Sequence, residues 1–211
     1  AAPGEAGGVA RVTAVPAPVA GAADAAGGDT VTEVVPLVPG GTALVSLPGP
    51  GTWAVRVDAD VPVVAAARSV RPRDEGAVDV GWAAGVAPAD VSGTVVPVPD
   101  LPEGAAARLH VVADAGAVVD LDLLDETGAV AGSRRLEIGA GAATADLDPV
   151  VGGARIAAVR LRAAPGAAGG APAGGAAQGA VGVSLSSPDG LATTTVRPRP
   201  AGGAVVRLVA G

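Results

Sequence analysis

Short runs in which apolar and polar residues alternate follow one another along most of this chain, and Pro and Gly separate them. The clearest run is Val119-Asp120-Leu121-Asp122-Leu123, where a period of two places the apolar side chains on one face of a strand and both aspartates in water. Short β-branched runs bounded by turn-forming residues are typical of antiparallel strands, and signals for helices are almost absent. We therefore predict an all-β chain, with strands at 9–15, 31–35, 43–47, 52–59, 61–70, 77–82, 94–98, 107–113, 117–124, 129–138, 142–147, 154–163, 180–185, 191–197 and 204–209.

A weak internal repeat divides the chain in two. Residues 41–47 followed by 53–57 read again as residues 141–147 followed by 158–161, and the offset of about a hundred residues is the usual length of one β-sandwich domain. The run at 9–15 matches 107–112 in the same way. Two related sandwich units are the simplest interpretation.

We expect these units to be tandem antiparallel β-sandwich domains at 1–90 and 91–211, the first of which can lack part of its N-terminal strand. The strand at 94–98 fits either the end of the first domain or the start of the second. Residues 165–179 consist almost entirely of Ala, Gly and Pro, which offer little to pack, so we expect a loop there.

The composition restricts how such domains are built. All fourteen basic residues are Arg, and Cys, Met, Phe, Tyr, Lys and Asn are missing. The cores must therefore consist of Val, Leu and Ala, with Trp53 and Trp82 as the large side chains. The absence of Cys excludes disulfides and thiol chemistry.

The charge and hydropathy patterns exclude two classes of partner. The net charge is −7, and the basic clusters are no larger than Arg71 with Arg73 and Arg134-Arg135, so nucleic-acid binding is not expected. Pro and Gly interrupt the long uncharged stretches, so no membrane span is expected within this chain. Because the chain begins with neither Met nor a leader, we expect a processed protein or a piece of a longer one, which leaves room for an anchor upstream.

The only histidine, His110, lies in a predicted strand between Leu109 and Val111, which alternation turns toward the core. We therefore expect His110 to face solvent. A Ser-His-Asp relay would need a nucleophile, and no nucleophile-elbow pattern occurs in the chain. One His without Cys also excludes a zinc site of several such ligands, and we assign no catalytic residue.

Asp120, Asp122, Asp125 and Glu126 form the densest cluster of carboxylates, and calcium binds six to eight oxygens. Their spacing is not that of an EF-hand, and charged side chains on a wet sheet face also prevent aggregation. We assign no metal and no cofactor, and keep Asp120 and Asp122 as weak candidates for a ligand surface. The charged segment 71–76 is interpreted as a surface turn.

Trp53 shares its strand parity with Val55 and Val57, and Trp82 shares its parity with Val78 and Val80. Both rings are therefore expected to pack in a core. The alternative is that they stack on a sugar ring, as exposed aromatics do in carbohydrate-binding sandwiches, and Trp82 is the weak candidate for such a surface.

The segment 61–69, the following Asp79-Val80-Gly81-Trp82 and the unit at 108–125 resemble a family of secreted, membrane-anchored actinobacterial proteins of unknown function. The resemblance covers about residues 30–211 and implies tandem immunoglobulin-like sandwiches on the outer face of the membrane, at the cell envelope. The family's Asn-Pro-Gly-like turns are replaced here by Pro16-Ala17-Pro18 and Asp114-Ala115-Gly116. No catalytic residue is implied.

We therefore expect a non-catalytic extracytoplasmic module that acts as a spacer or as a protein-interaction domain, with another envelope protein or a polysaccharide as partner. One alternative is a module that binds envelope polysaccharide through an exposed Trp82, although sugar sites usually need several aromatic faces. Another is an enzyme that uses Asp120 and Asp122 as paired carboxylates about 7 Å apart, although a wet face does not raise a pKa.

Overall fold

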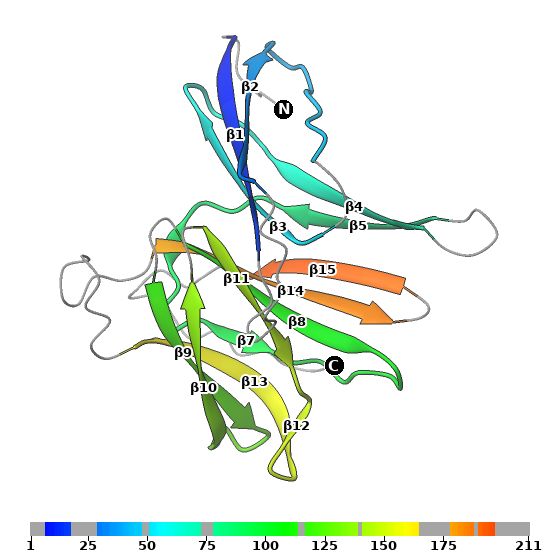
Figure 1. Ribbon diagram of the computed structural model, residues 1–211, viewed down its shortest axis with the longest axis vertical. Coiled ribbons are helices and arrows are strands. Elements are labelled where there is room, and N and C mark those ends of the chain that lie inside the picture. Colours follow the sequence, from blue (N-terminus) through cyan, green and yellow to red (C-terminus); the bar gives the residue numbers. More distant parts are fainter. Residues whose placement is uncertain are drawn as a thin grey trace.

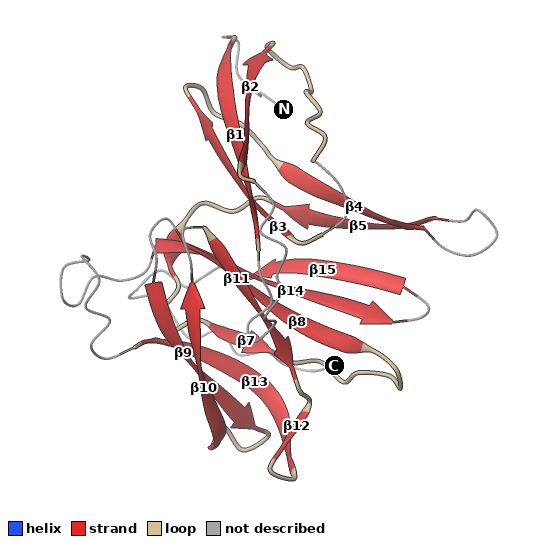
Figure 2. Ribbon diagram, in the orientation of Figure 1, coloured by secondary structure: helices blue, strands red, loops and turns tan. Residues whose placement is uncertain are grey.

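The computed structural model describes residues 7–17, 29–47, 51–72, 78–113, 117–138, 141–164, 178–187 and 190–196. Figure 2 shows strands joined by loops, and the described residues form no helix, hence none that could cross a membrane. The strand ladders in this part of the chain are antiparallel. The prediction of an all-β chain whose sheets pack in sandwich-like arrangements is confirmed.

The strands fall into two groups, which we call the first unit and the second unit. The first unit contains β1 (Gly8–Pro16), β2 (Val31–Leu37), β3 (Trp53–Ala59), β4 (Ala66–Pro72) and β5 (Val78–Ala84). The second unit contains β6 (Ala89–Asp90), β7 (Val95–Pro97), β8 (Ala106–Ala113), β9 (Ala117–Asp125), β10 (Val130–Ile138), β11 (Ala142–Leu147), β12 (Val150–Val151), β13 (Ala154–Ala163), β14 (Gln178–Ser187) and β15 (Gly190–Val196).

The second unit is a sandwich of two sheets, which lie against each other in the lower part of Figure 1. One sheet has the order β10-β9-β13-β12, with β7 also paired to β13, and the other has the order β11-β8-β14-β15, with β6 paired to β14. Alternating Val, Leu, Ile and Ala side chains on the inner faces form one contiguous core that runs from Val91 to Val183. Val119, Leu121 and Leu123 are buried in it, as their alternation predicted.

The first unit contains fewer strands than the second unit and smaller sheets. It consists of a three-stranded sheet of order β2-β1-β3 and the separate β4–β5 hairpin. Its buried apolar side chains among the described residues are Ala10, Ala14, Val35 and Ala54, all of which are small. Its larger apolar side chains are left exposed or half-buried.

The two units meet along the hairpin. In Figure 1, β5 lies beside β15 and runs in the same direction. The hydroxyl groups of Thr193 and Thr195 donate to the backbone carbonyls of Trp82 and Ala84, at 3.0 Å and 2.8 Å. Two further hydrogen bonds join the hairpin to the second unit, from the Leu191 amide to the Asp79 carboxylate and from Arg71 Nη1 to the Ser187 carbonyl. The hairpin is thus fixed to β15 by side-chain hydrogen bonds without a backbone ladder.

Most predicted strands appear within a few residues of their expected bounds, but two predictions are wrong. Residues 43–47 form a loop, and the strand expected at 61–70 begins only at Ala66. Neither segment takes part in a described strand ladder, and Pro62 in the second segment has no N–H to donate to one. The expectations for 204–209 and for most of 165–179 lie outside the described residues.

The strand at 94–98 is β7, and it pairs with β13 of the second unit, which answers the question that the sequence left open. The hairpin turn predicted at 125–128 is confirmed. There the Gly128 amide donates to the Asp125 carbonyl at 3.0 Å, and Gly128 has a φ of 83°, which favours glycine.

Candidate functional site

Asp122 is the centre of the densest polar cluster that the structure describes. Its neighbours across the strands are Ser133 on β10 and Arg160 on β13. Arg162 lies two residues further along β13, opposite Asp120 on the same face. Arg160 Nη2 and Arg162 Nε donate to Oδ2 at 2.7 Å and 2.6 Å, while Arg162 Nη2 and the Ser133 hydroxyl donate to Oδ1 at 2.8 Å and 3.0 Å. Both oxygens of this carboxylate are therefore fully engaged.

These contacts determine the charge state of Asp122. The hydrogen bond from Arg162 has the largest effect, and together with those from Arg160 and Ser133 it holds the pKa of Asp122 well below its usual range, although burial acts in the opposite direction. Asp122 is therefore ionised at neutral pH. A carboxyl held in this state cannot serve as a general acid, which would need a raised pKa.

The prediction that both aspartates lie in water is wrong for Asp122, which is only 2% exposed. Alternation correctly places Asp122 on the outer face of β9, but the side chains of Arg160 and Arg162 cover its carboxylate. Asp120 is more accessible, and Arg135 Nε donates to it at 3.1 Å. Arg160 and Arg162 were missed from the sequence, although their spacing of two in β13 mirrors that of Asp120 and Asp122 in β9.

His110 lies on the outer face of its sheet, as predicted, but it is partly buried instead of fully solvated. Its Nε2 shares a hydrogen bond of 2.7 Å with the hydroxyl of Ser184, a residue of β14 that the sequence did not single out. Burial lowers the pKa of His110 to about 4, and the positive charge of Arg108 adds to this effect. The imidazole is therefore neutral at physiological pH.

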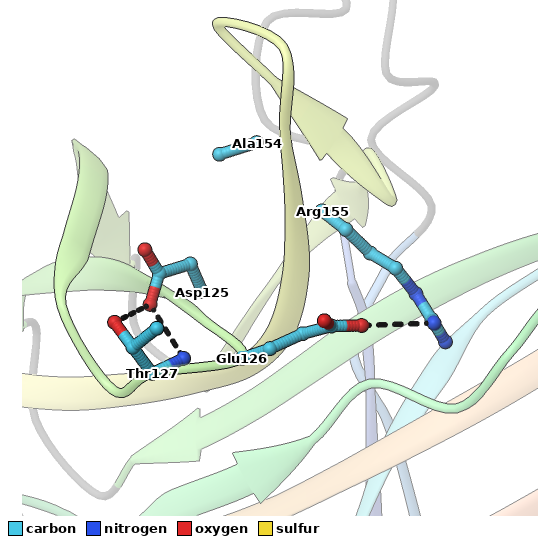
Figure 3. Close-up of a pocket in the computed structure, with 5 residues that line it drawn as sticks. All are labelled: Asp125, Glu126, Thr127, Ala154 and Arg155. Atoms are coloured by element: carbon cyan, nitrogen blue, oxygen red, sulfur yellow. Dashed lines mark hydrogen bonds and ion pairs between the residues drawn. The ribbon is translucent and has the colours of Figure 1, made fainter.

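The acidic residues at the β9–β10 turn line a surface depression of about 210 Å³, together with Thr127, Ala154 and Arg155 (Figure 3). Asp125 Oδ1 accepts hydrogen bonds from the hydroxyl and the amide of Thr127, at 2.7 Å and 2.8 Å, and the hydroxyl contact contributes most to the lowered pKa of Asp125. Glu126 pairs with Arg155 at 3.0 Å. No group of three metal-ligating side chains occurs among the described residues.

Trp82 lies in β5 and is 61% exposed, so the prediction that it packs in a core is wrong. Val70, Val78 and Val80 share its face of the hairpin, and these four side chains are between 41% and 61% exposed. Arg68 stands opposite Trp82 in the ladder. We call Val70, Val78, Val80 and Trp82 the hairpin face. Trp53, at the start of β3, is half-buried.

The hairpin face is exposed because the opposite face of the hairpin rests on β15. A Cβ on Gly81 would lie 2.8 Å from the hydroxyl oxygen of Ser69 and 3.6 Å from the side chains of Leu191 and Thr193. This position therefore has little room for a side chain. The glycine allows β5 to approach β15 closely, which turns Trp82 and its neighbours outward.

Comparison with known proteins identifies a family. The model of a family of unknown function, DUF5719, matches residues 1–150, which span the first unit and the second unit as far as β12. No curated protein and no solved structure matches the chain. The match covers Trp82, His110, Asp120 and Asp122 but not their partners Ser184, Arg160 and Arg162. The chain belongs to this family of unknown function, DUF5719.

Proposed function

We propose that this chain is a non-catalytic, extracytoplasmic β-sandwich module of a cell-envelope protein, and that it binds another protein through the hairpin face. The observation that carries the proposal is the exposure of Val70, Val78, Val80 and Trp82 side by side on one face of the β4–β5 hairpin. Contiguous exposed apolar surface marks interaction sites in soluble proteins, and Trp is enriched among the residues that dominate binding energy.

The attachment of the hairpin supports this proposal. The hydrogen bonds from Thr193 and Thr195 hold β5 on the second unit, whose continuous core is a rigid base. A partner would therefore meet a face that is already ordered, so that little conformational entropy is lost on binding.

The proposal of a non-catalytic role is supported by the state of the polar residues. The carboxylate of Asp122 is occupied by two guanidinium groups and a hydroxyl, and its pKa is lowered where acid catalysis would need it raised. The envelope location is proposed from the resemblance of segments 61–69 and 108–125 to secreted actinobacterial proteins.

The test is affinity capture from producing cells, with the tagged 211-residue chain compared with a Val78→Ser/Val80→Ser/Trp82→Ser variant. The matched control is Val34→Ser/Val38→Ser/Val64→Ser, which removes exposed valines away from the hairpin face. We expect one envelope protein to be recovered by the wild type and the control but not by the hairpin variant. Equal recovery by all three, or recovery of none, would contradict the proposal.

A second candidate function is the binding of envelope polysaccharide, and the exposure of Trp82 is the observation that favours it. An exposed indole can stack on a sugar ring, and Arg68 beside it can donate hydrogen bonds to hydroxyl groups. Trp fluorescence of a Trp53→Phe variant, which retains Trp82 alone, is titrated with arabinan, galactan and peptidoglycan fragments. A saturable change supports this function, whereas constant emission across the panel excludes it.

A further inference from the structure

Three arginine side chains lie together on the outer face of the β10-β9-β13 sheet. Arg135 and Arg162 both stand opposite Asp120, from the two neighbouring strands, and Arg160 stands opposite Asp122. Adjacent strands are about 4.8 Å apart and same-face residues of one strand are about 6.6–7 Å apart, so the three positions form a compact triangle. We call Arg135, Arg160 and Arg162 the arginine face.

The charges of this face are layered. Asp122 has a side-chain exposure of 3% and Asp120 of 15%, whereas Arg160, Arg162 and Arg135 are 40%, 46% and 57% exposed. The carboxylates therefore lie beneath and the guanidinium groups above. An approaching molecule meets donors first, even though the chain as a whole carries a net charge of −7.

The carboxylates also fix the guanidinium groups in place. Arg160 and Arg162 each bind Asp122 through Nε and Nη2. A guanidinium group has five N–H donors, so these contacts leave the Nη1 amino groups as further donors in the described structure. A group that is already oriented loses less entropy when it binds a second carboxylate.

We propose that the arginine face is a docking surface for an extended acidic segment of a partner protein, with carboxylates at alternate positions. The proposal rests on the proposed function in taking the partner to be a protein. Charge complementarity gives the chemistry, because fixed guanidinium groups bind carboxylates in a bidentate manner. The geometry gives the spacing, because alternate side chains of an extended peptide repeat at the distance that separates Arg160 from Arg162.

Glu137 lies on the same face, two residues from Arg135, so the three arginines are balanced by three carboxylates, those of Asp120, Asp122 and Glu137. The attraction is therefore short-ranged and depends on directed hydrogen bonds more than on the overall field. This predicts recognition of a defined spacing of carboxylates and little attraction to anions in general.

The experiment measures fluorescence polarisation of a labelled peptide with alternating Thr and Glu, titrated with the full chain, and compares it with the same peptide carrying Gln for Glu. The main variant, Arg160→Lys/Arg162→Lys, keeps a positive charge beside Asp122 and removes the planar guanidinium groups that bind carboxylates in a bidentate manner. The matched control is Arg56→Gln, which alters an arginine of similar exposure that pairs with Asp58 in the first unit. We expect saturable binding of the Glu peptide only, weakened about tenfold or more by the double variant and unchanged by the control.

Circular dichroism first establishes that the variants fold, and if the double variant does not, Arg135→Gln takes its place with the same expectation. Absence of peptide binding, or equal binding by all variants, would overturn the proposal, as would tighter binding of polygalacturonate than of the peptide. The hairpin variant Val78→Ser/Val80→Ser/Trp82→Ser is expected to bind the peptide normally. The two proposals can therefore fail separately. A negative peptide titration would not affect the result of the capture experiment on the hairpin face, and a negative capture experiment would not affect the peptide titration.

Discussion

The two units use the same small set of apolar residues but bury them to different extents. In the second unit the core is continuous from Val91 to Val183 between two sheets of comparable size. In the first unit the buried apolar side chains of the described residues are Ala10, Ala14, Val35 and Ala54, while Trp82 and many valines are exposed. Apolar content alone therefore does not make a core. A facing sheet of matching area is needed to cover it.

This difference assigns different roles to the two units. Burial of apolar surface stabilises by roughly 25 cal/mol per Å², so the second unit is the main source of stability. The first unit depends on its attachment to β15 and presents apolar surface to solvent. Stability is thus concentrated in the second unit, and the recognition of a partner that we propose belongs to the hairpin face of the first unit.

The largest expected contrast comes from one substitution made in both units. Leu121→Ala in the core is expected to reduce the free energy of unfolding by about 2–5 kcal/mol, because it removes buried methyl groups and leaves a cavity. Leu44→Ala is expected to change it by less than about 0.5 kcal/mol, because Leu44 is 80% exposed. Urea unfolding measures both, and similar losses would mean that the first unit has a core of its own.

A smaller contrast is expected between two ion pairs. Asp122→Asn is expected to cost about 1–3 kcal/mol, because charge-assisted hydrogen bonds to a buried carboxylate are lost. Asp58→Asn removes the partner of Arg56 in an exposed pair and should cost less than about 1 kcal/mol. Urea midpoints at neutral pH measure this difference, and equal costs would contradict the account of the Asp122 cluster.

The same cluster predicts a pH dependence. The pKa of Asp122 is lower in the folded chain than in the unfolded chain, so its contribution is complete above pH of about 4 and is lost as the pH falls toward the folded-state pKa. Asp122→Asn should therefore lose less stability than the wild type between pH of about 5 and 2. A parallel decline of both proteins would refute this assignment.

His110 gives a prediction at milder pH. Its pKa is about 4 in the folded chain and about 6.5 when unfolded, so its contribution to stability is complete above about 6.5 and declines as the pH falls toward 4. Because it is the only histidine, its NMR titration is unambiguous. We expect a midpoint near 4 and a higher midpoint in Arg108→Gln. A midpoint near 6.5 would show that the imidazole is solvated.

The smallest expected effect concerns the attachment of the hairpin. Thr193→Val and Thr195→Val keep the shape and strand preference of each residue and remove one hydrogen bond to β5. Each is expected to cost about 0.5–1.5 kcal/mol locally and to speed amide hydrogen exchange in β4 and β5 without affecting β8 or β9. Unchanged exchange in the hairpin would show that other contacts hold it.

Much of the second unit could be predicted from the sequence, because its strands alternate clearly and the alternating side chains are large enough to indicate a face. Val119, Leu121 and Leu123 are buried as expected, and the turn at Asp125 forms as expected. Alternation also assigned Trp82 to the same face as Val78 and Val80, which is correct.

Alternation could not reveal what lies opposite a face. Trp82 is exposed because none of the described sheets covers the hairpin face, and Asp122 is buried because Arg160 and Arg162, some forty residues later, cover it. Both outcomes depend on how strands pair across the chain. The local pattern that predicts each strand contains no information about this pairing.

Native-state amide hydrogen exchange of the full chain measures directly whether stability is concentrated in the second unit. We expect slow exchange in β8, β9, β13 and β14, governed by global unfolding, and markedly faster exchange in β1 to β5 through local opening. Protection of β1 to β5 as strong as that of the second unit would contradict this expectation. The first unit would then be as stable as the second, and stability would not be concentrated in one unit.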